Sequence, residues 1–117
     1  MKRSLPISVN AMAFEVVWHP SASVDLGEVI GYVCQNFGWT TSRKLYEDVM
    51  ARIDVFSVFP NLGVEMEGVT YQGITVRMMN IHQNAIVYSF DGKQIIIIVF
   101  WDNRRNPVRL EKIISSR

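Results

Sequence analysis

The chain has 117 residues, of which 49% are hydrophobic, 11% aromatic and 20% charged, enough apolar side chains for one domain with its own core. This composition excludes a disordered chain, a collagen-like chain and a coiled coil. The formal net charge is only +1, so the whole-chain charge offers no argument for nucleic-acid binding.

Two local features bear on the cellular setting. The longest apolar run, Ile95–Trp101, has seven residues, whereas a membrane-spanning helix needs about 20. The single cysteine, Cys34, has no partner for an internal disulfide. We therefore expect a protein of the reducing cytoplasm, with Cys34 as a small apolar packing residue.

The first twelve residues are predicted to form a flexible tail. The remainder, residues 13–117, is predicted to be a single domain with a basic C-terminal segment. The tail begins with a basic pair and a short apolar stretch, but Pro6 interrupts that stretch, so a secretory signal is rejected. Met12 stands directly before strand-like sequence and is an alternative start to Met1.

The first half of the domain predicts one strand and two helices. Phe14–Trp18 is β-branched and aromatic, as is typical of a strand. Ser21 or Ser23 is expected to cap the first helix, and Gly38 to end it. Its apolar residues recur at helical spacing on one face: Leu26, Val29, Ile30, Val33, Cys34 and Phe37.

A second helix follows after a short link, with Thr40, Thr41 or Ser42 as its cap. Its apolar face is predicted from residues spaced by four, four and three: Leu45, Val49, Ile53 and Phe56. The stretch Pro60–Gly63 ends it. Because the link is short, the two helices are expected to form an antiparallel hairpin.

The second half changes to the period of strands. The predicted strands are Val69–Gln72, Ile74–Ile81, Ala85–Phe90 and Ile95–Phe100, with a hairpin turn at Asp91-Gly92 between the last two and a short helix near Leu110–Ile114. The sequence therefore predicts an α+β fold, in which an N-terminal strand and an antiparallel helical hairpin pack on a curved antiparallel sheet of three to four strands. Ile95–Phe100 is apolar at both odd and even positions, which predicts a central strand covered on both faces. The two helices can cover one face, and curvature of the sheet, the C-terminal tail or a partner could cover the other.

Charge is divided unevenly along the chain. Residues 13–67 hold eight acids and three bases, whereas residues 68–117 hold seven bases and three acids. A basic face of the second half could attract phosphate or an acidic protein. A solvated C-terminal segment explains the same charges.

Several segments, taken in order, resemble the RelE/ParE superfamily of type II toxin–antitoxin toxins. They are Val17–Ala22, Asp25-Leu26, Ile30–Tyr32, Phe59–Gly63, Arg77, Ile86–Tyr88 and Ile98–Pro107, the last being the most specific. The resemblance covers about Phe14–Pro107. It implies a small cytosolic toxin wrapped by a cognate antitoxin, which is expected to cover the strand Ile95–Phe100. RelE-like members cut mRNA on the ribosome, and ParE-like members poison DNA gyrase.

The candidate site residues follow from the resemblance and from phosphate chemistry. Arg77 and Arg104 match the family's strand arginines, and a guanidinium offers paired donors for phosphate oxygens. Arg105 is the third candidate for binding target or phosphate. Tyr88 joins Arg77 and Arg104 as a catalytic candidate only if the chain is a nuclease, and His82 is a weaker candidate for a base.

Some departures weaken the nuclease interpretation. Glu65 and Glu67 stand where nuclease members carry lysines, and Pro107-Val108 stands where they carry an aromatic residue. Asp102 replaces a histidine of many relatives and is expected to pair with Arg104. No metal site or cofactor is predicted, because two distant histidines and one cysteine lack a ligand spacing.

Three functional hypotheses remain from the sequence. The first, slightly favoured, is a ParE-like toxin that acts by binding gyrase. The second is a RelE-like ribosome-dependent mRNA endonuclease, and the third is an inactive homologue that only binds its antitoxin.

Overall fold

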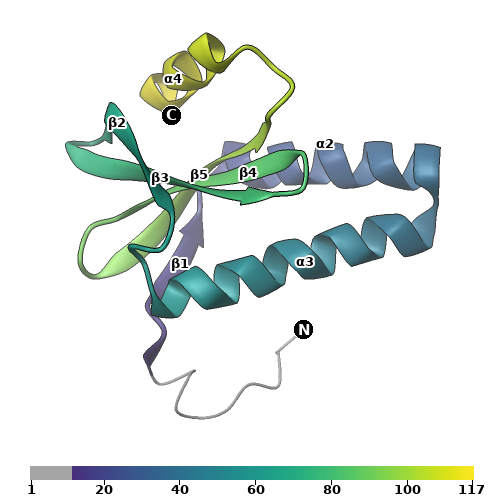
Figure 1. Cartoon of the computed structure of the whole chain (residues 1–117), viewed down its shortest axis with the longest axis horizontal. Helices are drawn as coiled ribbons and strands as arrows, with labels where there is room; N and C mark the ends of the chain where they lie inside the picture. The colour runs from purple at the N-terminus through teal and green to yellow at the C-terminus, as the bar shows by residue number, and fades with distance from the viewer. Residues whose placement is uncertain (1–11) are drawn as a thin grey trace.

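The computed structural model describes residues 12–117. The expectations for residues 1–11, including the flexible tail and the start at Met1, lie outside the described residues. The elements, in chain order, are β1 (Glu15–Trp18), α2 (Pro20–Phe37), α3 (Trp39–Val58), β2 (Val64–Tyr71), β3 (Ile74–Ile81), β4 (Asn84–Phe90), β5 (Gln94–Asp102) and α4 (Pro107–Ser116). This is the predicted α+β fold, with the hairpin α2–α3 beside a curved sheet (Figure 1).

The sheet has five strands in the order β1-β5-β4-β3-β2. The four strands β2 to β5 pair antiparallel, as predicted. The N-terminal strand β1 pairs parallel with β5, with Val16 opposite Ile95, which the sequence did not predict. A parallel neighbour requires a long crossover connection, and the helical hairpin is part of that connection.

Strand β2 is longer than predicted, since it begins at Val64 rather than at Val69. Its pairing with β3 shifts register between Glu65 and Thr70, and Gly68 within this stretch has φ +78°. Positive φ is accessible to glycine at little cost, so the chain bends there without losing the strand. Glu65 and Glu67 interrupt the strand-like pattern near the start of β2, so the sequence did not predict this part of the strand.

Gly38 ends α2 as predicted, but the N-terminal caps of α2 and α3 differ from the predicted ones. His19, not Ser21 or Ser23, caps α2, because its Nδ1 accepts a hydrogen bond from the Ser21 backbone N–H at 3.0 Å. Gly38, with φ +93°, joins the two helices and precedes α3 without a side-chain cap. Ser42 instead donates its hydroxyl to the Trp39 carbonyl within α3.

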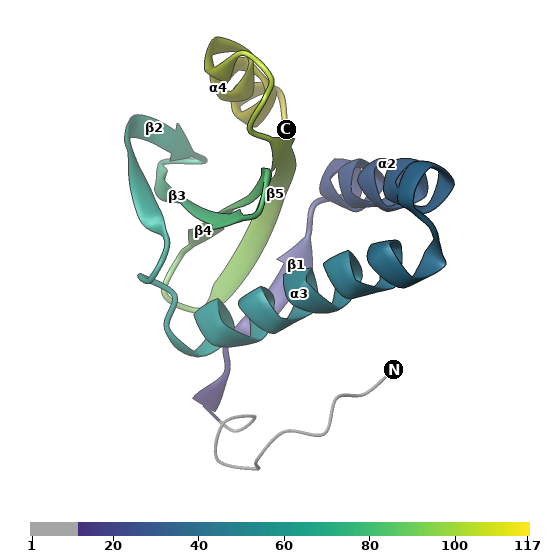
Figure 2. The same ribbon diagram turned by 45° about the vertical axis from the view of Figure 1, so that its right-hand side comes forward.

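The apolar face of α3 is in the core as predicted, with Val49, Ile53 and Phe56 buried. The face predicted for α2 is only partly buried. Leu26 lies in the core, but Cys34 is exposed and Phe37 is 64% exposed. Figures 1 and 2 show the reason, because the hairpin extends well beyond the sheet. The prediction that Cys34 is a packing residue is therefore wrong.

Strand β5 separates two apolar clusters, as its two-sided sequence predicted. On one face, Ile95 and Ile97 pack with residues of α2 and α3. On the other face, Ile98 and Val99 pack in a cluster that includes Leu110 and Ile114 of α4. Of the predicted coverings of the second face, the C-terminal segment is the one present, as α4, so no antitoxin is needed to bury this strand.

Candidate partner-binding groove

The predicted site residues lie in two separate places. Arg77 on β3 and Tyr88 on β4 are directly opposite each other in the antiparallel ladder. Arg104 and Arg105 lie in the turn that follows β5. The first pair contacts the loop between α3 and β2, whereas the second pair lines a groove beside α2.

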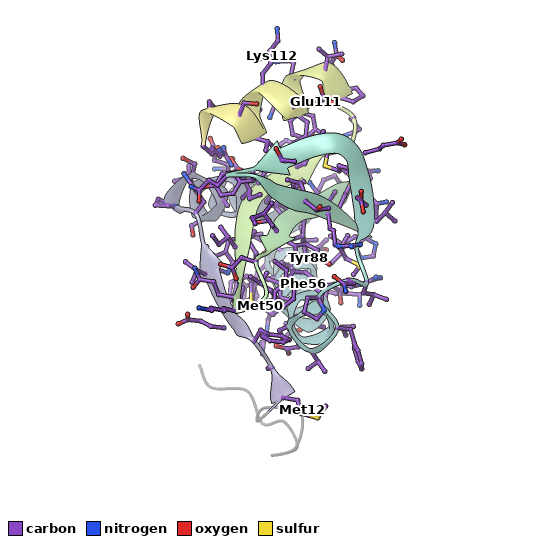
Figure 3. All side chains as sticks on the ribbon, turned by 90° about the vertical axis from the view of Figure 1, so that its left-hand side faces the viewer. Met12, Met50, Phe56, Tyr88, Glu111 and Lys112 are labelled. Atoms are coloured by element: carbon purple, nitrogen blue, oxygen red, sulfur yellow. The ribbon has the colours of Figure 1, made fainter. Side chains whose placement is uncertain are left out.

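Tyr88 is fully buried and its hydroxyl has two backbone partners. It donates to the Pro60 carbonyl at 2.7 Å and accepts from the Gly63 N–H at 2.9 Å. Its ring stacks on Phe56 with 4.1 Å between ring centroids and an interplanar angle of 2°; both side chains are labelled in Figure 3. Burial raises the pKa of this phenol, because the charged form loses its hydration.

Arg77 contacts the same loop. Its Nη1 donates to the Asn61 carbonyl at 3.2 Å and to the Gly63 carbonyl at 2.9 Å. A Cβ at Gly63 would lie 2.6 Å from the Tyr88 hydroxyl, so only glycine fits there. The segment Phe59–Gly63, noted in the sequence for its resemblance, is therefore a loop held by these two side chains.

Arg104 is paired with Asp102, as the sequence predicted. Its Nε and Nη2 donate to the two carboxylate oxygens at 3.0 and 2.9 Å, and its backbone N–H donates to the same carboxylate at 2.9 Å. These bonds hold the pKa of Asp102 below its usual range, because they stabilise the charged carboxylate. The Arg104 side chain remains 65% exposed.

Arg105 is held differently. Its guanidinium lies over the Trp101 ring at 4.7 Å from the centroid, a cation–π contact. Within residues 12–117 no carboxylate lies within ion-pair distance of it. Arg105 thus has no short ion pair, although its charge also helps to lower the pKa of the nearby Asp102.

The groove beside these arginines has a volume of about 690 Å³. It joins an apolar stripe of α2 to the polar ends of β4 and β5, and its lining includes Glu28, Val29, Tyr32, Val33, Phe37, Asn84, Phe100, Asp102, Arg104 and Arg105. The apolar stripe suits the apolar side chains of a protein segment, and Arg105 is placed to attract an acidic one, while the carboxylates of Asp25, Glu28 and Asp102 also line the groove. The sequence predicted that this stripe packs in the core. It is instead open to solvent, because α2 extends beyond the sheet.

His82 lies outside the groove lining. It has φ +54° in the turn between β3 and β4, and its Nε2 lies 3.1 Å from Oδ2 of Asp48 on α3. This contact is the main cause that lowers the pKa of Asp48. In the part of the chain that the structure describes, no three His, Cys, Asp or Glu side chains are grouped so as to hold a metal ion.

Comparison with known proteins identifies the fold. No family model and no curated protein sequence matches the chain. A solved structure from the chromosomal ParDE TA system of P. aeruginosa is similar over 78% of this chain and 97% of its own, with a TM-score of 0.60 and 16% sequence identity. The chain therefore has the RelE/ParE-like fold that the sequence resemblance predicted. Among residues 12–117, no helix is both long enough and apolar enough to cross a membrane.

Proposed function

We propose that this chain is the toxin of a type II toxin–antitoxin module, neutralised by a cognate antitoxin and acting in the cytoplasm. The ordered sequence resemblance and the ParE-like fold support this proposal. We further propose that the toxin acts by binding its target, with DNA gyrase favoured over the ribosome.

The candidate catalytic groups are hydrogen-bonded to other parts of the chain, which favours action by binding over action by RNA cleavage. A general acid or base must reach the proton that it transfers. The Tyr88 hydroxyl is buried with two backbone partners, and Arg77 is directed at two loop carbonyls. Arg104 is paired with Asp102, so each of these three candidates is already engaged by another group of the described chain.

Arg104 and Arg105 are the residues that we propose contact the target. They are exposed, and together they line the groove. An antitoxin segment seated in the groove would cover both, so neutralisation would occur by occlusion. The apolar stripe at Val29, Val33 and Phe37 would bind its apolar side chains, and Arg105 would bind a carboxylate.

The experiment that tests the mode of action uses the purified chain in two assays. The first maps mRNA cleavage in a cell-free translation reaction, and the second measures DNA supercoiling by gyrase. We expect intact message and inhibited supercoiling, with inhibition reduced by Arg105→Glu but not by Arg109→Glu on α4. Cuts confined to translated message, lost in Arg104→Ala, would establish the RelE-like alternative, in which Arg77 and Tyr88 take catalytic roles.

The remaining alternative is an inactive homologue that only binds an antitoxin. It predicts no growth arrest when the chain is expressed alone. Under our proposal, expression arrests growth, and co-expression of the cognate antitoxin restores it. Val33→Asp in the groove is expected to abolish that rescue, whereas Val24→Asp, exposed elsewhere on α2, leaves it intact.

A further inference from the structure

A second surface lies at the β2 edge of the sheet, opposite the edge formed by β1. Strand β2 is the last strand of the sheet, so within residues 12–117 no strand pairs with one side of its backbone. It has eight residues, whereas the opposite edge strand β1 has only four. Figure 3 looks onto this side of the molecule, and Figure 1 shows β2 at its margin. Open edges of this length are sites where another chain can add a strand.

Apolar side chains are exposed where this edge begins. Val64, the first residue of β2, is 72% exposed, and Phe59 and Leu62 in the preceding loop are also exposed. The loop is held in place by the hydrogen bonds of Tyr88 and Arg77. These apolar groups are thus presented on a rigid backbone, which reduces the entropy that binding must overcome.

The charge of the edge restricts what can bind. Glu65 and Glu67 are both exposed, and residues 59–71 contain no lysine or arginine. Arg77 lies opposite Glu65 in the ladder, but its Nη1 is directed at the loop carbonyls. A second copy of β2 would place acids against acids, which is unfavourable for cross-strand pairs. A strand that carries lysine or arginine would instead be attracted.

We propose that residues 62–67 bind an extended segment of a partner protein, which adds to β2 as a further strand through alternating apolar and basic side chains. The apolar side chains would contact Leu62 and Val64, and the basic ones Glu65 and Glu67. None of these residues lines the groove beside α2, so this surface goes beyond the proposed function, and both surfaces could be occupied together.

The test titrates the ¹⁵N-labelled chain with a short peptide of alternating valine and lysine and follows the backbone amide resonances. We expect the largest shifts at residues 62–67. The double variant Glu65→Lys/Glu67→Lys is expected to bind this peptide about tenfold more weakly and to bind the valine–glutamate peptide instead. The double variant Glu47→Lys/Glu111→Lys, with the same charge change on exposed helix positions, should bind as the original chain does.

A second peptide separates strand addition from general attraction of charge. It has the same composition but carries prolines at one odd and one even position, so that neither of its edges can donate a full set of hydrogen bonds. We expect it not to bind. Equal binding of both peptides, shifts centred outside residues 62–67, or no binding would each overturn the proposal, whatever the outcome of the growth and supercoiling assays.

Discussion

Arg117 and Asp25 form a bidentate ion pair across 92 positions of the sequence. Arg117 Nη1 donates to Asp25 Oδ2 at 2.6 Å and Nη2 to Oδ1 at 3.0 Å, and the side chains are only 15% and 19% exposed. Nη1 also donates to the Ile98 carbonyl, and the same carboxylate accepts the Phe100 N–H. The pair therefore ties the end of α4 to both α2 and β5, which keeps α4 over the second apolar cluster.

Removal of this carboxylate should destabilise the fold. Asp25→Ala is expected to lower the free energy of unfolding by about 2 kcal/mol, because it leaves a largely buried guanidinium without its counter-ion. Urea unfolding followed by circular dichroism measures the change. Glu28→Ala, one turn along α2, is the control and should change stability by no more than about 0.5 kcal/mol. Equal effects of the two variants would contradict a stabilising role for the pair.

Gly63 should tolerate no side chain. Gly63→Ala places a Cβ 2.6 Å from the Tyr88 hydroxyl and 2.8 Å from its ring carbon, so we expect a loss of about 2 kcal/mol. The matched control is Gly31→Ala in α2, where nothing lies within 4 Å of the added Cβ. That change should stabilise the chain by about 0.5–1 kcal/mol through helix propensity. Thermal unfolding of both variants distinguishes a steric effect from a general effect of alanine.

Tyr88 should make the folded protein less stable at alkaline pH. Its pKa is raised in the fold by burial, so folding favours the neutral phenol. The stabilisation is fully present below the usual pKa of about 10 and is lost as pH rises through the folded-state value. Tyr88→Phe should lose about 1–3 kcal/mol at neutral pH, since two buried backbone groups lose their partner. The difference in the free energy of unfolding between the two proteins, measured with urea, should become smaller above pH 10. A difference that stays constant with pH would argue against this account.

The ion pair between Asp102 and Arg104 should lower the pKa of Asp102 measured in an acid titration of the folded protein. The hydrogen bonds from Arg104 lower the pKa of Asp102 in the fold, so this carboxylate contributes stability above its unfolded pKa of about 3.9. That contribution is lost as pH falls through the lower folded-state value. Carboxyl ¹³C NMR should show Asp102 titrating below the usual range, and Arg104→Ala should bring its pKa back up. An unchanged titration in the variant would mean that the pair does not form in solution.

Local pattern determined the elements of this protein and their fold class. The helical spacing of Val49, Ile53 and Phe56, the turn at Asp91-Gly92 and the two-sided apolar strand Ile95–Phe100 each reflect short-range geometry, and the structure contains them all. The pairing of Asp102 with Arg104 was also predictable, because the two residues are neighbours in the chain.

Only the tertiary structure determined what the side chains of these elements contact. The stripe of α2 that includes Val33 and Phe37 has core-like spacing, yet it lines an open groove because the hairpin extends beyond the sheet. Tyr88 and Arg77 support a loop, and Arg117 meets Asp25, through contacts between segments far apart in the chain. Periodicity shows which face of an element is apolar, but which surface meets that face depends on how the whole chain packs.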